Sequence, residues 1–173
     1  IHTNGNPYKL PQVDRGKWVD GLDIEHFSDQ EYLFYVGCVG SYDERGKQMA
    51  RSVARVLRDW HVSFGILGPD EHCDGNDVCS LGETGLFRQL AEQTIQQFSD
   101  LNVKKIITLS PHAYHAMTTE YPKYGPEFDV YHYSQIVEGL MKTVPLKPKG
   151  APVRVTFHDP CYLGRHHQEY KAP

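Results

Sequence analysis

Short continuous apolar runs alternate with longer segments in which apolar residues recur every three or four positions, from residue 32 onward. The runs predict strands covered on both faces, and the periodic segments predict helices with one face on a core. The predicted strands cover residues 32–36, 62–67, 106–109, 128–131 and 153–157. Such alternation indicates an α/β fold with three layers and a mainly parallel, doubly wound sheet of about five strands.

Polar residues ahead of the periodic segments predict where helices begin. Ser41 with Glu44, and Ser80 with Glu83, have the spacing of a capping box. Ser110 precedes a proline and is a natural N-cap. The predicted helices cover residues 43–60, a stripe within 86–98, a segment from 111 to near 122, and 135–142.

The chain divides into two parts. Residues 1–31 are rich in glycine, proline and polar side chains, which indicates an irregular lead-in or linker. Residues 32–173 carry the regular pattern and form the α/β domain, interrupted by a proline-rich linker at 145–152. We expect this domain to be truncated at its C-terminal end, because Cys161 opens a motif close to the last residue.

Composition excludes several classes of partner and location. The formal net charge is −4 over 173 residues, with both signs mixed along the chain, so nothing indicates binding to nucleic acid. No run is long and apolar enough for a membrane span, and no signal peptide is evident. Four cysteines are too few for a secreted disulfide framework and favour a reducing compartment. We expect a cytoplasmic protein, or a peripheral one on the cytoplasmic face of the membrane.

Residues with possible chemistry follow the predicted strands. Cys38 follows the first strand, Cys73 the second, His112 the third and Cys161 the fifth. Ligands of doubly wound sheets bind beyond the carboxyl ends of the strands. Cysteines that meet there are what a thiolate-ligated metal site needs.

This arrangement resembles the cysteine-rich CCG domain family, which includes the B-type and D-type subunits of heterodisulfide reductase and related iron–sulfur oxidoreductases. The family motif is a Cys, some thirty-odd residues, Cys-Cys-Gly, a similar gap, and Cys-Pro-x-Cys. Here 34 residues separate Cys38 from Cys73. Asp74, Ser110 and Ala113 stand where the motif has its other three cysteines, so the first motif is degenerate. Cys161 looks like the start of a second motif.

The resemblance implies an oxidoreductase subunit that transfers electrons in anaerobic or respiratory metabolism, with a [4Fe–4S]-type iron–sulfur cluster held by cysteines. It implies Cys161, Cys38 and Cys73 as cofactor-binding residues. The implied partners are redox subunits, a ferredoxin or flavoprotein, and a membrane-bound quinone-linked subunit. A cluster needs about four thiolates. We therefore expect this chain alone to hold an incomplete site and to be inactive without the rest of its parent protein.

Other interpretations stay open. Cys38, Cys73 and His112 could bind a structural zinc ion in a non-catalytic scaffold or docking domain, since imidazole and thiolate suit that metal. Alternatively, Cys38 is a small packed residue, Ser110 a helix cap and His112 a solvent-facing side chain. A generic Rossmann-like ligand-binding domain is a third option, although the glycines after the first strand do not match a nucleotide-binding loop.

Overall fold

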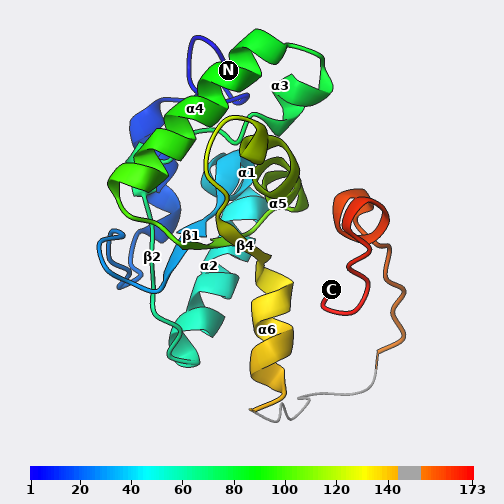
Figure 1. Ribbon diagram of the computed structural model, residues 1–173. Coiled ribbons are helices and arrows are strands. Elements are labelled where there is room, and N and C mark those ends of the chain that lie inside the picture. Colours follow the sequence, from blue (N-terminus) through cyan, green and yellow to red (C-terminus); the bar gives the residue numbers. More distant parts are fainter. Residues whose placement is uncertain (144–152) are drawn as a thin grey trace.

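The computed structural model describes residues 1–143 and 153–173, and it contains a parallel sheet of four strands in the order β2-β1-β3-β4 (Figure 1). The strands are β1 (Tyr32–Tyr35), β2 (Phe64–Gly65), β3 (Lys105–Thr108) and β4 (Asp129–His132). Leu33 is in register with Gly65 on one side and with Ile106 on the other. Because all four strands run in the same direction, the loops after them meet at one edge of the sheet.

Helices connect the strands. The α-helices are α1 (Gly37–Tyr42), α2 (Glu44–Asp59), α3 (Asn76–Ser80), α4 (Thr84–Asp100), α5 (Pro111–His115) and α6 (Tyr133–Met141). The 3₁₀ helices are η1 (Gln12–Val19), η2 (Gly68–Asp70) and η4 (Tyr121–Lys123), and the π-helical turns are η3 (Ala116–Glu120) and η5 (Tyr162–His166). Among the described residues, no helix is both long and apolar enough to cross a membrane.

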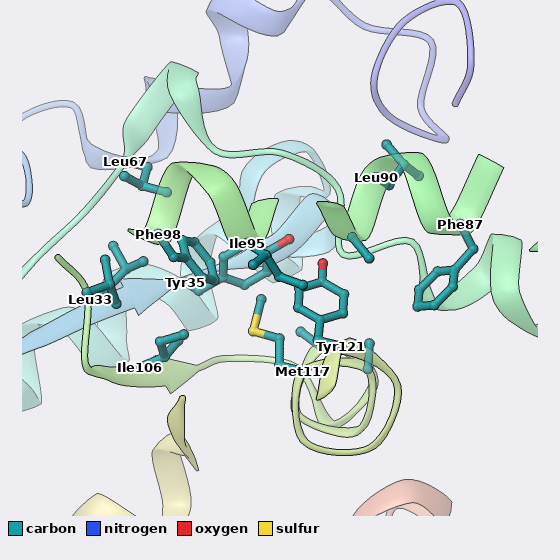
Figure 2. Packing of buried hydrophobic residues seen from close by; sticks show 14 of the residues in the cluster. Leu33, Tyr35, Leu67, Phe87, Leu90, Ile95, Phe98, Ile106, Met117 and Tyr121 are labelled. Atoms are coloured by element: carbon teal, nitrogen blue, oxygen red, sulfur yellow. The ribbon is translucent and has the colours of Figure 1, made fainter. Parts of the chain in front are cut away.

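Alternate residues of the strands face two separate cores, which makes the domain three-layered. Leu33 and Tyr35 of β1 pack with Phe98 and Ile95 of α4 and with the α5–η4 segment (Figure 2). Phe34 and Val36 point to the opposite face. That face is covered by the apolar stripe of α2, and its buried members are Ala50, Val53, Ala54 and Leu57.

The lead-in segment packs onto the domain. Trp18 of η1 is 2% exposed and meets the ring of Phe34 edge-on. Arg51 of α2 donates hydrogen bonds to the carbonyl oxygens of Trp18 and Asp20. His26 forms a parallel bridge with Ile66, just beyond β2. These contacts fix η1 beside the carboxyl edge of the sheet, where its buried arginine becomes important.

The predicted α/β, three-layer, parallel fold is confirmed, but the predicted fifth strand over 153–157 is wrong. This segment has no regular secondary structure and pairs with none of the described strands. Val153, Val155 and Phe157 are 79%, 84% and 62% exposed, and the segment runs apart from the sheet in Figure 1. Alternating β-branched and aromatic residues favour extended backbone, but a strand also needs a neighbour that supplies its hydrogen bonds. The linker predicted at 145–152 lies outside the described residues.

The two predicted capping boxes are also wrong. Asp43, not Ser41, caps α2, and its carboxylate accepts a hydrogen bond from the Gly46 N–H at 2.8 Å. Ser41 is buried inside α1 instead. Ser80 ends α3, and α4 starts at Thr84 without a side-chain cap. The cap at Ser110 is confirmed, because its hydroxyl accepts from the His112 N–H at 3.1 Å.

Candidate functional site

The loops after β1, β2 and β3 enclose a cavity of about 350 Å³. Its lining includes Cys38, Cys73, Asp74, Ser110 and His112. The cavity lies at the carboxyl edge of the sheet, where the sequence predicts that residues after the strands meet. Cys38, Cys73 and His112 therefore share one site, while Cys161 is not part of its lining.

The backbone between β1 and α1 places the first cysteine. Gly37 has φ +71°, a left-handed conformation that residues with a Cβ rarely adopt. A Cβ at this position would meet the side chains of Tyr35 and Asp74 only at ordinary van der Waals distance, so the backbone conformation and not space is what favours glycine. This turn brings Cys38 to the end of the strand, where it is 7% exposed. Cys73 reaches the same point from the loop after β2 and is 6% exposed.

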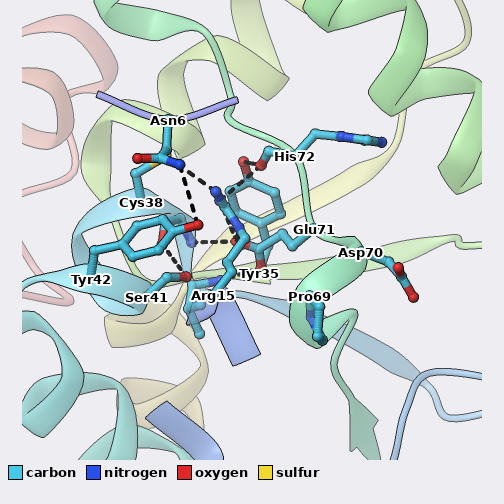
Figure 3. A network of polar contacts seen from close by, with 12 residues as sticks. Asn6, Arg15, Tyr35, Cys38, Ser41, Tyr42, Pro69, Asp70, Glu71 and His72 are labelled. Atoms are coloured by element: carbon cyan, nitrogen blue, oxygen red, sulfur yellow. Dashed lines mark hydrogen bonds and ion pairs between the residues drawn. The ribbon is translucent and has the colours of Figure 1, made fainter. Parts of the chain in front are cut away.

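A buried ion pair of Arg15 and Glu71 lies next to Cys38 (Figure 3). Nη2 of Arg15 is 2.8 Å from Oε1 of Glu71, and the side chains are 0% and 2% exposed. The Glu71 carboxylate also accepts hydrogen bonds from the backbone N–H groups of Val36 and Gly37, at 3.0 and 2.9 Å. Nη2 of Arg15 donates a further bond to the His72 carbonyl oxygen. With these partners, the guanidinium is fixed in one position.

That position puts a positive charge against one sulfur. Nη1 of Arg15 lies 3.4 Å from Sγ of Cys38. Burial lowers the pKa of Arg15, but Glu71 and Cys38 more than offset this, so its pKa stays well above the ordinary value. The guanidinium is thus a permanent cation facing the Cys38 thiol.

The two thiols also interact with each other, and they pack in a small cluster with Tyr42. A hydrogen bond from the Cys73 thiol and the charge of Arg15 lower the pKa of Cys38, although burial and Asp74 oppose them. The interaction with Cys38 and burial raise the pKa of Cys73. Both cysteines are free. Of the two, Cys38 is the one set up to carry a thiolate.

The remaining motif positions are committed to other roles. The Ser110 hydroxyl caps α5. Ala113 is fully buried in the core and has no donor atom. Asp74 accepts a hydrogen bond from the Asn76 N–H at 2.9 Å, and burial raises the pKa of its carboxyl group.

Cys161 is exposed, and its sulfur has the guanidinium of Arg165 as a neighbour at 3.8 Å. The next residue, Tyr162, reaches the cavity region. Its ring packs edge-on against His112, with centroids 4.7 Å apart, and its hydroxyl lies 3.4 Å from the Asn76 amide nitrogen. The segment after Cys161 therefore contacts the loops that surround the cavity, although the thiol itself does not line it.

These donors do not fit an iron–sulfur cluster in the cavity. A cluster needs about four thiolates, and the lining offers two, next to a carboxylate and a committed hydroxyl. The zinc alternative at Cys38, Cys73 and His112 gains no support either. Within residues 1–143 and 153–173, no three His, Cys, Asp or Glu side chains are arranged to hold a metal ion.

Sequence reasoning missed the pair of Arg15 and Glu71. The two residues are 56 positions apart, and no local motif links them. The only signal was indirect: a charged residue within the loop after a predicted strand, followed closely by a cysteine. The cation that pairs with Glu71 depends on how residues 1–31 pack against the domain, and this packing cannot be deduced from one sequence.

Comparison with known proteins places these residues in a family. A sequence profile of the cysteine-rich domain family, CCG, matches residues 32–118. The chain is 38% identical to the EtfAB:quinone oxidoreductase of Syntrophomonas wolfei subsp. wolfei and 40% identical to the probable iron-sulfur-binding oxidoreductase FadF of Bacillus subtilis. Each match covers 100% of the chain and 26% of the relative.

A third relative is one of the subunits of the dihydromethanophenazine:CoB--CoM heterodisulfide reductase of Methanosarcina mazei. It is 30% identical over 97% of the chain and 42% of its own length. The chain thus spans about a quarter of the first two relatives and less than half of the third. No solved structure matches it. The matched profile covers half of the sequence, and it includes both cysteines that meet in the cavity. The chain belongs to the cysteine-rich CCG domain family.

Proposed function

We propose that this chain is a domain of an iron–sulfur oxidoreductase that passes electrons from a flavoprotein towards a quinone-linked membrane partner. The observation that carries the proposal is the match along the whole chain to a protein described as an EtfAB:quinone oxidoreductase. Similarity to an iron-sulfur-binding oxidoreductase and to a component of heterodisulfide reductase supports the same class of reaction. We place the protein at the cytoplasmic face of the membrane, close to that partner.

We assign Cys161 as a cluster ligand, together with cysteines from other parts of a longer protein. Its thiol is exposed and is therefore accessible to a cluster that cysteines from elsewhere also bind. Bound thiolates tune the reduction potential of a cluster, and such a cluster supplies one-electron transfer. The 173-residue chain alone would then hold no complete cluster and would be inactive as an electron carrier.

A second candidate is a docking domain without redox chemistry of its own. The observation that favours it is the replacement of three motif cysteines by Asp74, Ser110 and Ala113. In this case the domain would only support a cluster-binding half of the protein, through contacts such as those of Tyr162 with the α5 region.

The test is reduction and reoxidation of the full-length protein, purified without oxygen and followed by its visible absorbance. We expect a reduced electron-transfer flavoprotein to bleach the cluster absorbance, and a water-soluble quinone to restore it. Cys161→Ser should remove this response, whereas Cys79→Ser, which changes a thiol outside the motif, should leave it intact. The proposal fails if the flavoprotein does not reduce the wild-type protein, or if Cys161→Ser behaves like wild type.

A further inference from the structure

The cavity is lined by two thiols that interact with each other, but it lacks the further thiolate ligands that a cluster needs. Cys38 and Cys73 have 34 residues between them in the sequence, and both line the same cavity. Two adjacent thiols in a protein can be oxidised together to a disulfide, with the release of two electrons and two protons. Such a pair is a possible redox centre in itself.

The surroundings make the two sulfurs unequal. Arg15 contacts Sγ of Cys38 at 3.4 Å, and no comparable bond from Arg15 to the Cys73 sulfur is present in the described chain. Glu71 holds the guanidinium through two hydrogen bonds, at 2.8 and 3.3 Å. An arginine fixed in this way favours a negative charge on one sulfur only. A dithiol with one activated sulfur and one protonated sulfur has the asymmetry that thiol–disulfide exchange requires.

The cavity gives a small molecule access to these sulfurs. Its volume of about 350 Å³ lies within the range of small-ligand sites. Its lining includes solvent-exposed residues, among them Val39, Asp77 and His112, so the cavity communicates with the surface. Asp74 and Asp77 add carboxyl groups to the wall. An anionic ligand would be repelled there, and an uncharged or cationic one would not.

We propose that Cys38 and Cys73 form a redox-active dithiol that reduces a small uncharged or cationic disulfide, with Arg15 as the residue that positions and activates Cys38. The Cys38 thiolate attacks one sulfur of the disulfide, and the other half leaves as a thiolate that takes up a proton. A mixed disulfide then links Cys38 to the remaining half. Cys73, after losing its proton, attacks the sulfur of Cys38, and the second half leaves as a thiol.

This step balances. One external disulfide bond and two protein thiols become one protein disulfide and two external thiols, and two electrons move from the protein to the small molecule. The proposal is independent of the proposed electron transfer through Cys161, because it uses neither that cysteine nor a cluster. Each can fail without the other.

The test uses bis(2-hydroxyethyl) disulfide, an uncharged probe, on reduced protein in which Cys79→Ser and Cys161→Ser remove the two more exposed thiols. After an acid quench, peptide mass spectrometry locates the products. We expect a single new disulfide between Cys38 and Cys73. With Cys73→Ser added, we expect the probe half to be trapped on Cys38. With Cys38→Ser added, we expect Cys73 to react more slowly than Cys38 does, because the Arg15 guanidinium contacts the sulfur of Cys38 and makes no comparable bond to the sulfur of Cys73 in the described residues.

The role of Arg15 is tested separately. Arg15→Gln combined with Glu71→Gln removes both buried charges at once, and circular dichroism checks that the variant folds. We expect the rate of probe trapping on Cys38 to fall at about pH 7 and to recover at higher pH, because the thiolate is lost rather than the site. A purely structural role would not move this pH profile.

The proposal is overturned if the two thiols stay reduced under probe excess, or if Cys73 is trapped as fast as Cys38. It is also overturned if the Arg15→Gln/Glu71→Gln variant folds and keeps the wild-type pH profile of Cys38 trapping.

Discussion

The buried pair of Arg15 and Glu71 gives the sharpest stability prediction, because an exposed pair of the same length serves as its control. The Glu71→Ala variant leaves the fully buried Arg15 without its counter-charge and removes the acceptor for the N–H groups of Val36 and Gly37. Breaking a buried pair by removing one partner costs about 3–5 kcal/mol. Each unsatisfied N–H adds about 1–3 kcal/mol unless water replaces the carboxylate.

The control is Glu31, which pairs with Lys105 at the same N···O distance of 2.8 Å but is 51% exposed. Glu31→Ala should cost only about 0.2–1 kcal/mol, since solvent screens the pair. The assay is urea denaturation of both variants and wild type, compared as free energies of unfolding. With a typical total stability of about 5–15 kcal/mol, the loss at Glu71 is large enough to measure or to unfold the domain.

Two further variants separate charge from hydrogen bonding. Glu71→Gln keeps an acceptor for the backbone N–H groups and should lose less stability than Glu71→Ala. Arg15→Met with Glu71→Gln removes both charges and should be more stable than Glu71→Ala alone, because no unpaired charge stays buried. If Glu71→Ala is no more destabilising than Glu31→Ala, the buried pair of Arg15 and Glu71 does not stabilise the fold more than an exposed pair does.

Two other predictions concern His132 and Gly37. His132 is 4% exposed, and burial lowers its pKa to about 4, below the ordinary value of 6.5. Since the unfolded chain takes up this proton first, stability from His132 is present above the ordinary pKa and is lost as pH falls towards 4, by about 2 kcal/mol at about pH 5. Urea denaturation measures the free energy of unfolding at about pH 7 and about pH 5. Between these two pH values, it should fall less for His132→Asn, which retains a capping side chain, than for wild type. An equal fall in both proteins would show that His132 does not cause this pH dependence. Gly37→Ala should cost at least about 1 kcal/mol because of its positive φ, whereas Gly85→Ala, which meets no neighbour near the start of α4, should be neutral or stabilising; equal thermal shifts would disprove the backbone argument.

Strands were predictable from the sequence where burial on both faces produces a continuous apolar run. The apolar runs that form β1 and β3 are buried on both faces, so nearly every residue in them is apolar. The same signal failed at 153–157, because an exposed segment without regular secondary structure and a paired strand can share one composition. Only the presence of a neighbouring strand separates them, and that is a property of the whole fold.

For the helix starts and for the site, too, local sequence patterns predicted some features and missed others. Ser110 was recognisable because a proline follows it directly, and proline restricts the choice of the first helical residue. At Ser41, the next helix has a stronger local competitor in Asp43, which the capping-box spacing ignores. The meeting of Cys38 with Cys73 followed from parallel strand order. The electrostatics of the two cysteines could not be predicted, because Arg15 belongs to residues 1–31, whose packing no local sequence pattern specifies.

We infer that Cys38 and Cys73 act as a pair of thiols and hold no cluster. The most direct measurement is the iron and sulfide content of the anaerobically purified full-length protein. We expect the variant with both Cys38→Ser and Cys73→Ser to keep the wild-type content of iron and sulfide, and Cys161→Ser to lose iron. Loss of iron from the double variant would show instead that the two thiols are cluster ligands.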